Sequence, residues 1–524
     1  MKELTTYILL PLAGRLLFCF YASCNATFPR YAIYLIGEML VLSLLLILLN
    51  RKLRFFLIPI LLAHTLQLTN LSMTGYWVDP NTLQNINEAD SIGSSIYKIF
   101  FLTVGYSICW VPALFSNAEF HLNKKIKFSV LFGATTFFLL SGSPIRNLTV
   151  AISDAWTTLT FSISNNQSIR DYFLRHHSAT YSIPNKYGLS GGGYNIILIF
   201  AEGTSSSIIS KELMPNTAKF LSESLTFKNY YNHQAATFRG IRGTLISGFT
   251  YRGGLFNRKG FAEIPKNDII SLYSNTVESI PSILKQCGYQ TVFISPHSKN
   301  EALATLMTAV GFEESITSNK FSGFESDEKM YEKIFSQAVQ LNNNGRFFLS
   351  SYIAGTHHGL DSDNLKYGDG KNSYKNKFFN QDYWFGEFLK KFKRSPLSKN
   401  TFVILTSDHS TYPSSEFKKT FNISTSVFHD RIPLGIYGPG IKKGEVNSEI
   451  RNSLALAPTI LDILNIQKYD SHFLGNSLFT DASKWERYCA QGSSTYYIED
   501  DGTVKKIKDN EFSKMLKLFY SISG

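Results

Sequence analysis

The sequence predicts a two-part protein, in which five transmembrane helices precede an α/β domain with a mostly parallel sheet. Two observations lead to this fold class. Apolar stretches about as long as a bilayer-spanning helix fill the first part of the chain. From residue 194 onward, strand-like runs alternate with amphipathic helical patterns. We therefore expect a membrane domain at 1–144, an amphipathic connector at 145–193 and an outer domain at 194–524.

Five apolar stretches supply the predicted spans. They run approximately over Tyr7–Cys24, Tyr31–Leu49, Phe55–Met73, Ile99–Phe115 and Phe128–Leu140. Most have the length of a membrane helix, and the last is short. Because no convincing small-residue cleavage site follows the first stretch, we interpret it as an anchor and not as a removed signal.

Basic residues determine the predicted orientation of these spans. Two loops are basic, one with Arg51, Lys52 and Arg54 and the other with Lys124, Lys125 and Lys127. The loop 75–93 is acidic and contains no Lys or Arg. By the positive-inside rule, the N-terminus and both basic loops are cytoplasmic. Five crossings then place everything after Pro144 on the outer side of the membrane.

Charge and cysteine content narrow the possible partners. The net charge of +12 is spread along the chain, without the arginine–aromatic interleaving of a nucleic-acid groove. It suits anionic lipid headgroups or phosphate-bearing substrates, so we expect no nucleic acid partner. Arg15, Glu38 and His64 fall inside predicted spans, where ionisable side chains are often functional. Only Cys287 and Cys489 lie in the outer part, which allows at most one disulfide there.

The connector and the outer domain follow in order. In Ile145–Tyr187, apolar residues interleave with Ser, Thr and Arg, as in helices that lie on a membrane surface, and a plain linker is the alternative. The predicted strands are Ile196–Ala201, Thr291–Ser295, Phe347–Ile353, Phe402–Thr406 and Leu434–Tyr437. The predicted helices are Asn216–Glu223, Ser279–Cys287, Glu301–Val310, Lys329–Leu341, Asp382–Phe392, Ser453–Leu464 and, in a polar tail, Asp509–Tyr520.

Chemistry-bearing residues follow several of these strands. Glu202 ends the unbroken apolar run that begins at Ile196. In open α/β sheets ligands bind at the carboxyl ends of strands, so an acid there is a candidate site residue, although a solvated residue in a capping loop is an alternative. Asp408 and His409 end another strand, where carboxylate oxygen and imidazole nitrogen together suit zinc or manganese.

Two further clusters join them. The paired His357 and His358 follow the strand Phe347–Ile353 and suit substrate or metal contacts. The glycine-punctuated stretch TFRGIRGTLISG, 237–248, enters a predicted helix, whose N-terminus would hold an anion. Each cluster alone also fits a turn or a charged surface. Their grouping in one α/β domain favours a single site.

These residues resemble the alkaline phosphatase/sulfatase superfamily. Within it, they resemble the membrane-anchored branch of lipoteichoic acid synthases and lipid A phosphoethanolamine transferases. The resemblance covers roughly Asn195–Phe479 and the five-span anchor. Its landmarks, in family order, include NIILIFAEG, TFRGIRGTLISG, RFFLSSYIAGTHH, FVILTSDHS and RIPLGIYGPGI. It implies a sulfatase-like catalytic domain at 194–524, on the periplasmic side of a bacterial cytoplasmic (inner) membrane.

The resemblance also implies one divalent metal ion, Zn²⁺ or Mn²⁺. Its ligands would be Glu202, Asp408 and His409, with the hydroxyl nucleophile as the fourth ligand. We assign the nucleophile to Thr237, which lies one residue from the position that the family spacing gives.

Thr204 and Thr244 are the alternative nucleophiles, although Thr204 is close to Glu202 in the chain. Arg239 and Arg242 would neutralise phosphoryl oxygens, and His357 or His358 would protonate a leaving group. His429 matches a further family position.

The function implied is transfer of a phosphoethanolamine or phosphoglycerol headgroup. The donor would be phosphatidylethanolamine or phosphatidylglycerol, the intermediate a phospho-threonine, and the acceptor an envelope glycan or lipopolysaccharide. A true sulfatase is disfavoured, because the turn lacks the Cys or Ser that is converted to formylglycine. A phosphodiesterase of the same fold and a catalytically silent envelope-binding protein are the alternatives.

Overall fold

The computed structural model describes most of the chain, and two compact units divide it. Unit 1 comprises Met1–Thr157 with Pro413–Ser424, and unit 2 comprises Thr158–Tyr412 with Thr425–Gly524. The described residues are 12–16, 28–74, 77–78, 83, 95–116, 123–139, 142–160, 166–178, 187, 193–251, 269–270, 273, 277–298, 302–320, 323–425, 427–491 and 494–523.

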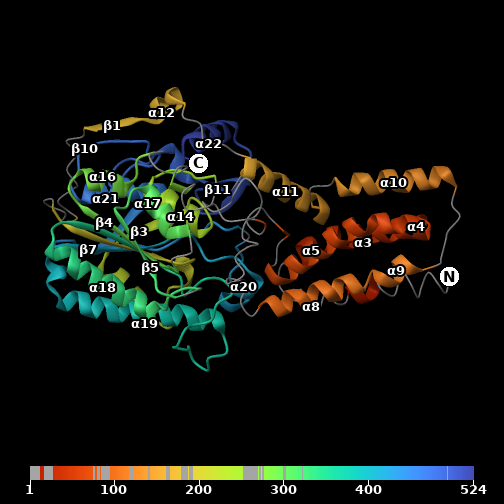
Figure 1. Ribbon diagram of the computed structural model, residues 1–524, viewed down its shortest axis with the longest axis horizontal. Helices are drawn as coiled ribbons and strands as arrows, with labels where there is room; N and C mark the ends of the chain where they lie inside the picture. The colour runs from red at the N-terminus through yellow and green to blue at the C-terminus, as the bar shows by residue number, and fades with distance from the viewer. Residues whose placement is uncertain are drawn as a thin grey trace. The chain divides into compact units, whose positions relative to one another are not determined.

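The described secondary-structure elements of unit 1 are all helices (Figure 1). Its helices are α3 (Phe28–Leu48), α4 (Arg51–Arg54), η2 (Phe55–Leu57), α5 (Ile58–Thr74), α8 (Ser95–Ile108), α9 (Val111–Phe115), α10 (Lys124–Phe138), most of α11 (Pro144–Thr160) and α20 (Ser415–Phe421). One described helical stretch, Arg51–Met73, is long and apolar enough to cross a membrane, and Ile33–Leu48 and Ile99–Phe115 are shorter apolar helices. Most of the first predicted span lies outside the described residues, so the five-span arrangement stays a prediction.

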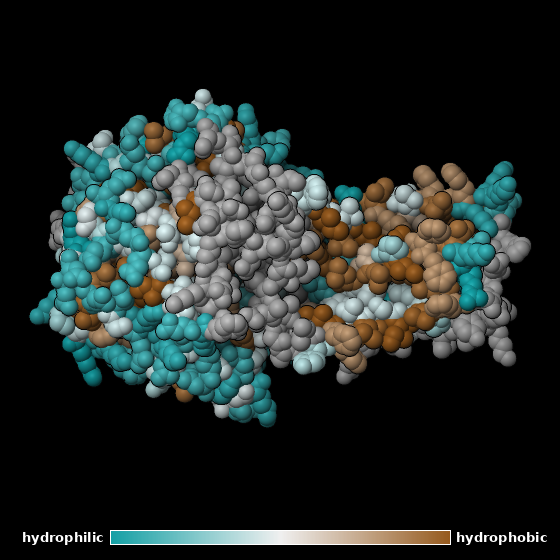
Figure 2. Space-filling view, in the orientation of Figure 1, coloured by the Kyte–Doolittle hydropathy of each residue, from teal (hydrophilic) through white to brown (hydrophobic). Residues whose placement is uncertain are grey.

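The surface of unit 1 is apolar where a soluble protein would be polar. Figure 2 shows brown, hydrophobic residues gathered over its helices. Phe56, Phe100 and Phe132 are 77%, 70% and 67% exposed, respectively. Because soluble proteins rarely expose apolar side chains in such density, this surface is suited to contact with lipid.

Buried polar side chains of unit 1 contact one another or the backbone inside it. Arg15 is buried and donates to Thr65 Oγ1 at 3.0 Å, and its Nη2 lies 3.1 Å from His64 Nδ1. Glu38 Oε2 accepts the backbone N–H of Ile145 at 3.3 Å, at the N-terminus of α11. The three ionisable residues noted in the sequence therefore have structural partners within this unit.

A mixed, mostly parallel sheet forms the centre of unit 2. Its eight strands lie in the order β5-β4-β6-β2-β7-β8-β3-β9. Only β8 runs antiparallel to its neighbours β7 and β3. The strands are β2 (Asn195–Ala201), β3 (Leu225–Tyr231), β4 (Gln290–Ser298), β5 (Glu314–Ser318), β6 (Phe347–Ile353), β7 (Thr401–Ser407), β8 (Leu434–Tyr437) and β9 (Gly444–Asn452).

Helices cover both faces of this sheet (Figure 1). One face carries α13 (Pro215–Glu223), α18 (Asp327–Asn343) and α19 (Ser373–Arg394). The other carries α14 (Thr237–Leu245), α16 (Ile280–Gln286), α17 (Ala302–Val310), α21 (Leu456–Ile463) and α22 (Asn510–Ser523). Strand β2 shows why both faces of the sheet need to be covered. Its alternate residues Ile196 and Leu198 pack into one core, and Ile197 and Ile199 into the other, so this apolar run is buried on both faces.

All five predicted strands and all seven predicted helices of unit 2 are present, but the sequence interpretation missed several polar strands. Strands β5 and β9 close the two edges of the main sheet. Strand β1 (Arg175–Ser178) of the connector pairs with β10 (Lys468–Ser471), after the helix α12 (Gln167–Phe173). The polar tail forms a three-stranded sheet, β11 (Tyr488–Gln491), β12 (Ser494–Ile498) and β13 (Val504–Ile507), before α22. The remaining short helices are η4 (Ser206–Ile208), η5 (Pro396–Lys399), η6 (Ser453–Ala455) and η7 (Lys484–Arg487).

The cysteines of unit 2 do not form a disulfide. Cys287 and Cys489 are both free, and burial raises the pKa of the Cys489 thiol well above its ordinary value. The fold of unit 2 therefore depends on its two apolar cores.

Candidate metal centre and nucleophile

Three neighbouring strands bring the predicted site residues to one edge of the sheet. β2 lies between β6 and β7, with Ala201 opposite Ile353 on one side and Ser407 on the other. Because all three strands are parallel, their carboxyl ends meet. Glu202 follows β2, Asp408 and His409 follow β7, and the loop 354–359 follows β6. The topology thus joins residues that lie about two hundred positions apart in the chain.

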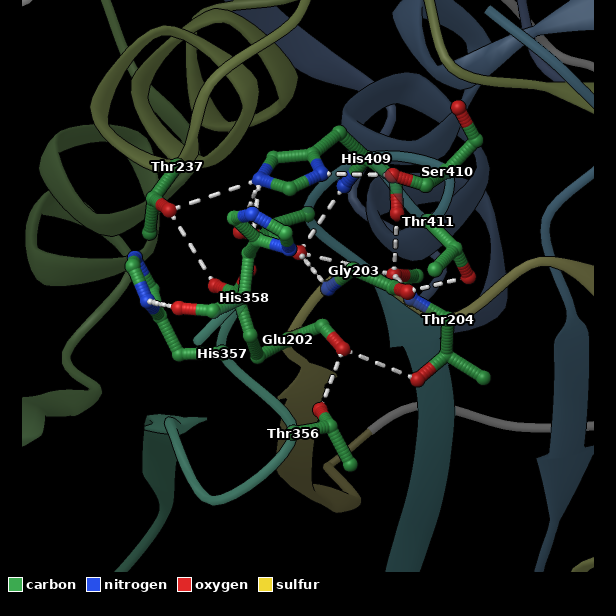
Figure 3. A network of polar contacts seen from close by, with 12 residues as sticks. Glu202, Gly203, Thr204, Thr237, Thr356, His357, His358, His409, Ser410 and Thr411 are labelled. Atoms are coloured by element: carbon green, nitrogen blue, oxygen red, sulfur yellow. Dashed lines mark hydrogen bonds and ion pairs between the residues drawn. The ribbon is translucent and has the colours of Figure 1, made fainter. Parts of the chain in front are cut away.

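Glu202, Asp408 and His409 form a compact buried cluster. One ligand atom from each lies within 4.8 Å of the others. His409 Nε2 is 3.2 Å from Asp408 Oδ2 and 3.6 Å from Glu202 Oε1. Figure 3 shows the side chains of Glu202 and His409 converging with that of Thr237.

Hydrogen bonds from the backbone orient Asp408 and His409. Asp408 Oδ1 accepts the N–H groups of Gly203 and His409, both at 2.9 Å. Its other oxygen, Oδ2, is buried and has no hydrogen-bond partner. His409 Nδ1 lies 2.8 Å from the carbonyl oxygen of Ser410, and since a carbonyl can only accept, Nδ1 carries the proton. The lone pair of Nε2 therefore points into the cluster.

Thr237 adds a hydroxyl group to this cluster. Its Oγ1 donates to Glu202 Oε2 at 3.1 Å and lies 3.4 Å from His409 Nε2 (Figure 3). Thr237 is the first residue of α14, where the helix dipole favours negative charge. The preceding residue, Ala236, has φ +27°, a left-handed conformation that is strained for any residue with a Cβ. This bend aims the start of α14 at the cluster.

Gly240 allows α14 to approach the backbone that follows β7. A Cβ at this position would overlap the backbone carbonyl oxygen of Asp408. A side chain at position 240 would therefore hold the helix, and Thr237 with it, away from Asp408.

The donor set fits a divalent metal ion. Two carboxylates, an imidazole lone pair and a hydroxyl oxygen face one another, and such a set suits zinc or manganese. Without a cation, the buried Oδ2 of Asp408 would remain unsatisfied opposite the lone pair of His409. A cation between these atoms would remove the energetic penalty of leaving this oxygen without a partner.

The two carboxyl groups have opposite pKa shifts. Burial raises the pKa of Asp408 well above its ordinary value, and the nearby negative Glu202 adds to the effect. Burial also acts to raise the pKa of Glu202, but the positive influence of His409 and His357, with the Tyr352 hydroxyl, outweighs it and lowers that pKa.

Two supporting residues escaped the sequence interpretation. Tyr352 is buried on β6, and its hydroxyl donates to Glu202 Oε2. Thr356 donates from Oγ1 to the backbone carbonyl of Glu202 at 2.5 Å. Tyr352 lies within an apolar run, so only its place one strand away from Glu202 identifies it. Thr356 directly precedes the histidine pair, and this position was the only indication in the sequence that it belongs to the site.

The alternative nucleophiles lie in other surroundings. Thr204 directs Oγ1 to the backbone carbonyl of Glu202 at 3.0 Å and is almost fully buried. Thr244 is buried inside α14, and its Oγ1 has no hydrogen-bond partner. Of the three threonines, Thr237 is the one whose hydroxyl contacts the side chains of two candidate metal ligands.

The paired histidines have different surroundings. His357 Nδ1 lies 3.0 Å from the carbonyl oxygen of His358, and its ring points towards Thr237 in Figure 3. His358 Nδ1 lies 2.8 Å from Tyr374 Oη. Burial, the Lys377 ammonium and His357 lower the pKa of His358 to about 3. Lys377 is itself buried and donates to the carbonyl oxygen of His357 at 3.0 Å, so α19 holds this loop in place.

Arg239 and Arg242 are buried beside the C-terminal part of the unit. Arg239 donates to the carbonyl oxygen of Tyr251 at 3.1 Å. Arg242 donates to the carbonyl oxygen of Ser523 and lies 4.5 Å from the centre of the Tyr273 ring. These contacts give both arginines a structural role, and their assignment to the phosphoryl group stays a prediction.

His429 is buried near the cluster. Its Nδ1 lies 3.3 Å from Asn232 Nδ2, and its Nε2 has no hydrogen-bond partner. Burial lowers the pKa of His429 to about 3, so the ring is neutral.

Comparison with known proteins places this geometry in a family. The sequence model of the family described as Sulfatase matches residues 194–466. Arylsulfatase K of Canis lupus familiaris is 30% identical over 109 residues, which is 20% of this chain and 20% of that protein. The chain thus matches only about a fifth of the length of this relative.

Two solved structures have a similar fold. A protein of the alkaline phosphatase superfamily from Vibrio parahaemolyticus superposes with a TM-score of 0.51 at 18% identity, covering 71% of this chain and 93% of its own. The lipoteichoic acid synthase LtaP from Listeria monocytogenes gives a TM-score of 0.51 at 18% identity, covering 68% and 96%, respectively. At this identity the likeness establishes the fold.

Proposed function

The chain belongs to the sulfatase family, and from that premise we propose that it transfers a phosphoryl headgroup of a membrane phospholipid through Thr237. The headgroup is phosphoethanolamine or phosphoglycerol, and the acceptor is an envelope glycan or lipopolysaccharide. The observation that carries this proposal is the contact of Thr237 Oγ1 with both Glu202 Oε2 and His409 Nε2. The likeness to a lipoteichoic acid synthase and the apolar surface of unit 1 support a lipid-borne donor.

The residues of the cluster have distinct roles in this proposal. Glu202, Asp408, His409 and Thr237 would hold one Zn²⁺ or Mn²⁺. A bound divalent cation lowers the pKa of a coordinated hydroxyl and offsets phosphoryl charge. The backbone N–H groups that bind Asp408 Oδ1 fix that carboxylate, while Tyr352 fixes Glu202.

Two displacement steps follow from this arrangement. First, Thr237 Oγ1 forms a bond to the phosphorus while the bond to the diacylglycerol oxygen breaks. The hydroxyl proton leaves along the hydrogen bond to Glu202, and His357 gives a proton to the diacylglycerol oxygen. His358 suits this role less, because burial lowers its pKa to about 3 and leaves its ring neutral. Second, an acceptor hydroxyl oxygen attacks the phosphorus and His357 takes its proton. The bond between the phosphorus and Thr237 Oγ1 breaks, and Thr237 takes back the proton held by Glu202.

Intact mass spectrometry tests this proposal directly. Full-length protein is incubated with Zn²⁺ or Mn²⁺ and vesicles that contain phosphatidylethanolamine or phosphatidylglycerol. We expect a covalent adduct of one headgroup in the wild type, in Thr204→Ala and in Thr244→Ala, and no adduct in Thr237→Ala. An adduct that persists in Thr237→Ala would identify another nucleophile. No adduct with either lipid, in a protein that binds metal, would refute the transfer mechanism.

Hydrolysis is the nearest competing outcome. In a phosphodiesterase of this fold, water and not a glycan would resolve the phospho-threonine. Product analysis with and without an acceptor distinguishes the two activities, because only a transferase needs the acceptor for turnover. A catalytically silent envelope-binding protein would form no adduct and would not require the buried metal-ligand set.

A sulfatase activity is the second candidate, favoured by the family and by the match to an arylsulfatase. It would require a nucleophile that can be converted to formylglycine, and the site presents the hydroxyl of Thr237 instead. Release of sulfate from an aryl sulfate ester by the wild type, at a rate that Thr237→Ala abolishes, would favour this activity over headgroup transfer.

A further inference from the structure

An aromatic cluster borders the nucleophile on one side. We define the aromatic wall as Phe238, His297, Phe324 and His357, all half-buried in unit 2. Phe238 directly follows Thr237 on α14, and His357 lies in the loop after β6. His297 lies near the end of β4, and Phe324 precedes α18. Four separate segments thus contribute one ring each, and the His357 ring points towards Thr237 (Figure 3).

The rings of the wall are in mutual contact. The ring centroids of His297 lie 4.9 Å from Phe324 and 6.3 Å from Phe238, and those of Phe324 and His357 are 5.4 Å apart. A backbone bridge between His297 and Phe324 holds the first pair in register. Beneath them, the buried ring of Tyr352 stacks on His297 at 6.0 Å. The wall is therefore a fixed surface and not a set of independent side chains.

The wall lies within electrostatic range of the candidate metal ligands. Glu202 influences the pKa of His297, and His357 influences the pKa of Glu202. Desolvation, with a further contribution from His357, lowers the pKa of His297 to about 3. At neutral pH the His297 ring is thus uncharged and does not repel a cation.

The polar atoms of this region are largely engaged inside the protein. The Tyr352 hydroxyl donates to Glu202, His297 Nδ1 lies 3.2 Å from Ser295 Oγ, and His357 Nδ1 contacts the carbonyl oxygen of His358. A glycerol headgroup needs partners for its hydroxyl groups, which this surface provides poorly. An ammonium group needs only the faces of aromatic rings, which attract cations.

We propose that the aromatic wall selects a phospholipid donor whose headgroup carries an ammonium group, over one that ends in glycerol. This inference rests on the proposed function, since it assigns the headgroup that Thr237 would receive. The phosphate would lie at Glu202, Asp408 and His409, and the ammonium would contact the half-buried rings of Phe238 and Phe324. A primary and a quaternary ammonium share this chemistry, and the experiment distinguishes them.

Calorimetry on the metal-loaded, full-length protein tests the wall without requiring transfer. The probes are O-phosphoethanolamine, phosphocholine and glycerol 3-phosphate. We expect one of the two ammonium compounds to bind about tenfold more tightly than glycerol 3-phosphate, and the tighter of the two identifies the headgroup. Phe238→Leu and Phe324→Leu keep an apolar side chain but remove a ring, and should each reduce this preference about threefold to tenfold. Tyr383→Leu, which removes an exposed ring from α19, is the matched control and should leave the preference unchanged.

Equal affinity for the three probes, or a preference that survives both Phe→Leu changes, would overturn the inference. A uniform loss for all probes in both variants would also overturn it, because the wall would then be merely structural. These outcomes are separate from the adduct assay. A protein with the ammonium preference but no adduct would retain the wall and refute headgroup transfer. An adduct of phosphoglycerol alone would retain transfer and refute the wall.

Discussion

Tyr352 shows how one residue outside the ligand set can determine its geometry. Glu202 Oε2 accepts hydrogen bonds from two hydroxyl groups, those of Thr237 and Tyr352. The first comes from the nucleophile and the second from the neighbouring strand. Because Tyr352 is buried, its hydroxyl fixes the rotation of the Glu202 carboxylate and directs Oε1 towards His409.

Removal of this hydroxyl should weaken metal binding. We expect Tyr352→Phe to lower the affinity for Zn²⁺ or Mn²⁺ about tenfold or more, since residues that orient a ligand contribute that much. Isothermal titration calorimetry measures the effect. Tyr230→Phe, at a second buried tyrosine on β3, is the control and should leave metal affinity unchanged. Equal metal affinity in Tyr352→Phe and the wild type would exclude this orienting role.

His233 predicts a pH dependence of stability. It is fully buried behind α14, where its Nδ1 contacts Ser453 Oγ and its Nε2 contacts the carbonyl oxygen of Gly248. Burial lowers its pKa to about 3, against an ordinary value of 6.5. Between these two values His233 binds a proton in the unfolded chain but not in the folded protein. The free energy of unfolding therefore falls as the pH drops from about 6.5 towards 3.

At pH 5 this single residue should cost about 2 kcal/mol of unfolding free energy relative to pH 7. Urea unfolding of the wild type and His233→Gln at the two pH values isolates the contribution. We expect the variant to be less stable at both values but to lose less stability on acidification. A variant with the same pH dependence as the wild type would show that His233 is not the titrating group. Burial raises the pKa of Asp327 to about 7, so this residue changes the pH dependence of stability in the opposite direction. The variant and the wild type share this contribution, which therefore cancels when the two are compared.

Helix α14 is the element that positions the nucleophile. The strained conformation of Ala236 precedes it, and Gly240 brings it against the backbone of Asp408. Both positions determine how close Thr237 lies to the end of β7. The helix is therefore fixed by close backbone approach as well as by side-chain packing.

Substitution of Gly240 tests the close approach. Gly240→Ala should destabilise unit 2 by about 1–3 kcal/mol, as overpacking commonly does, and should weaken metal binding because Thr237 is displaced. Urea unfolding and metal titration measure the two effects. Gly444→Ala, at a position with open space around its Cβ, should change neither by more than about 0.5 kcal/mol. If Gly240→Ala bound metal as the wild type does, α14 would not set the site geometry.

Strands and helices differed in how well the sequence predicted them. The buried strands β2, β6 and β7 are rich in apolar residues, and so their extent could be read directly. The acids after β2 and β7 and the histidine pair after β6 could be read in the same way. The edge strands β5 and β9 are polar because one side of an edge strand meets solvent, and this hides them from a search for apolar runs.

The candidate ligands were noticed in the sequence because they follow strands, whereas Tyr352, which lies within a strand, was not. Glu202, Asp408 and His409 each stand at a strand end, and the structure brings them together. Tyr352 lies inside an apolar run, so its partner could be found only from the order of strands in the sheet. The contacts of Arg239 and Arg242 with Tyr251 and Ser523 depend on tertiary packing that no local pattern records.

The whole molecule combines an apolar helical unit with a polar α/β unit. The positive-inside rule predicts that residue 125 is cytoplasmic and residue 500 is on the outer side. This can be tested by labelling with a membrane-impermeant maleimide in a variant whose native cysteines are replaced by serine. In spheroplasts we expect Asp500→Cys to react and Lys125→Cys to react only after lysis. Labelling in the reverse order would invert the predicted topology.

The parallel arrangement of β6, β2 and β7 has a consequence for biogenesis. Ser205 and Thr411 exchange reciprocal hydrogen bonds at 3.0 and 3.1 Å across the ends of β2 and β7, although about two hundred residues separate them. During synthesis from the N-terminus, Glu202 emerges long before Asp408 and His409. Non-local pairing of this kind is slow, so the cluster forms only once the central strands have joined. Metal uptake would thus report that folding of this unit is complete.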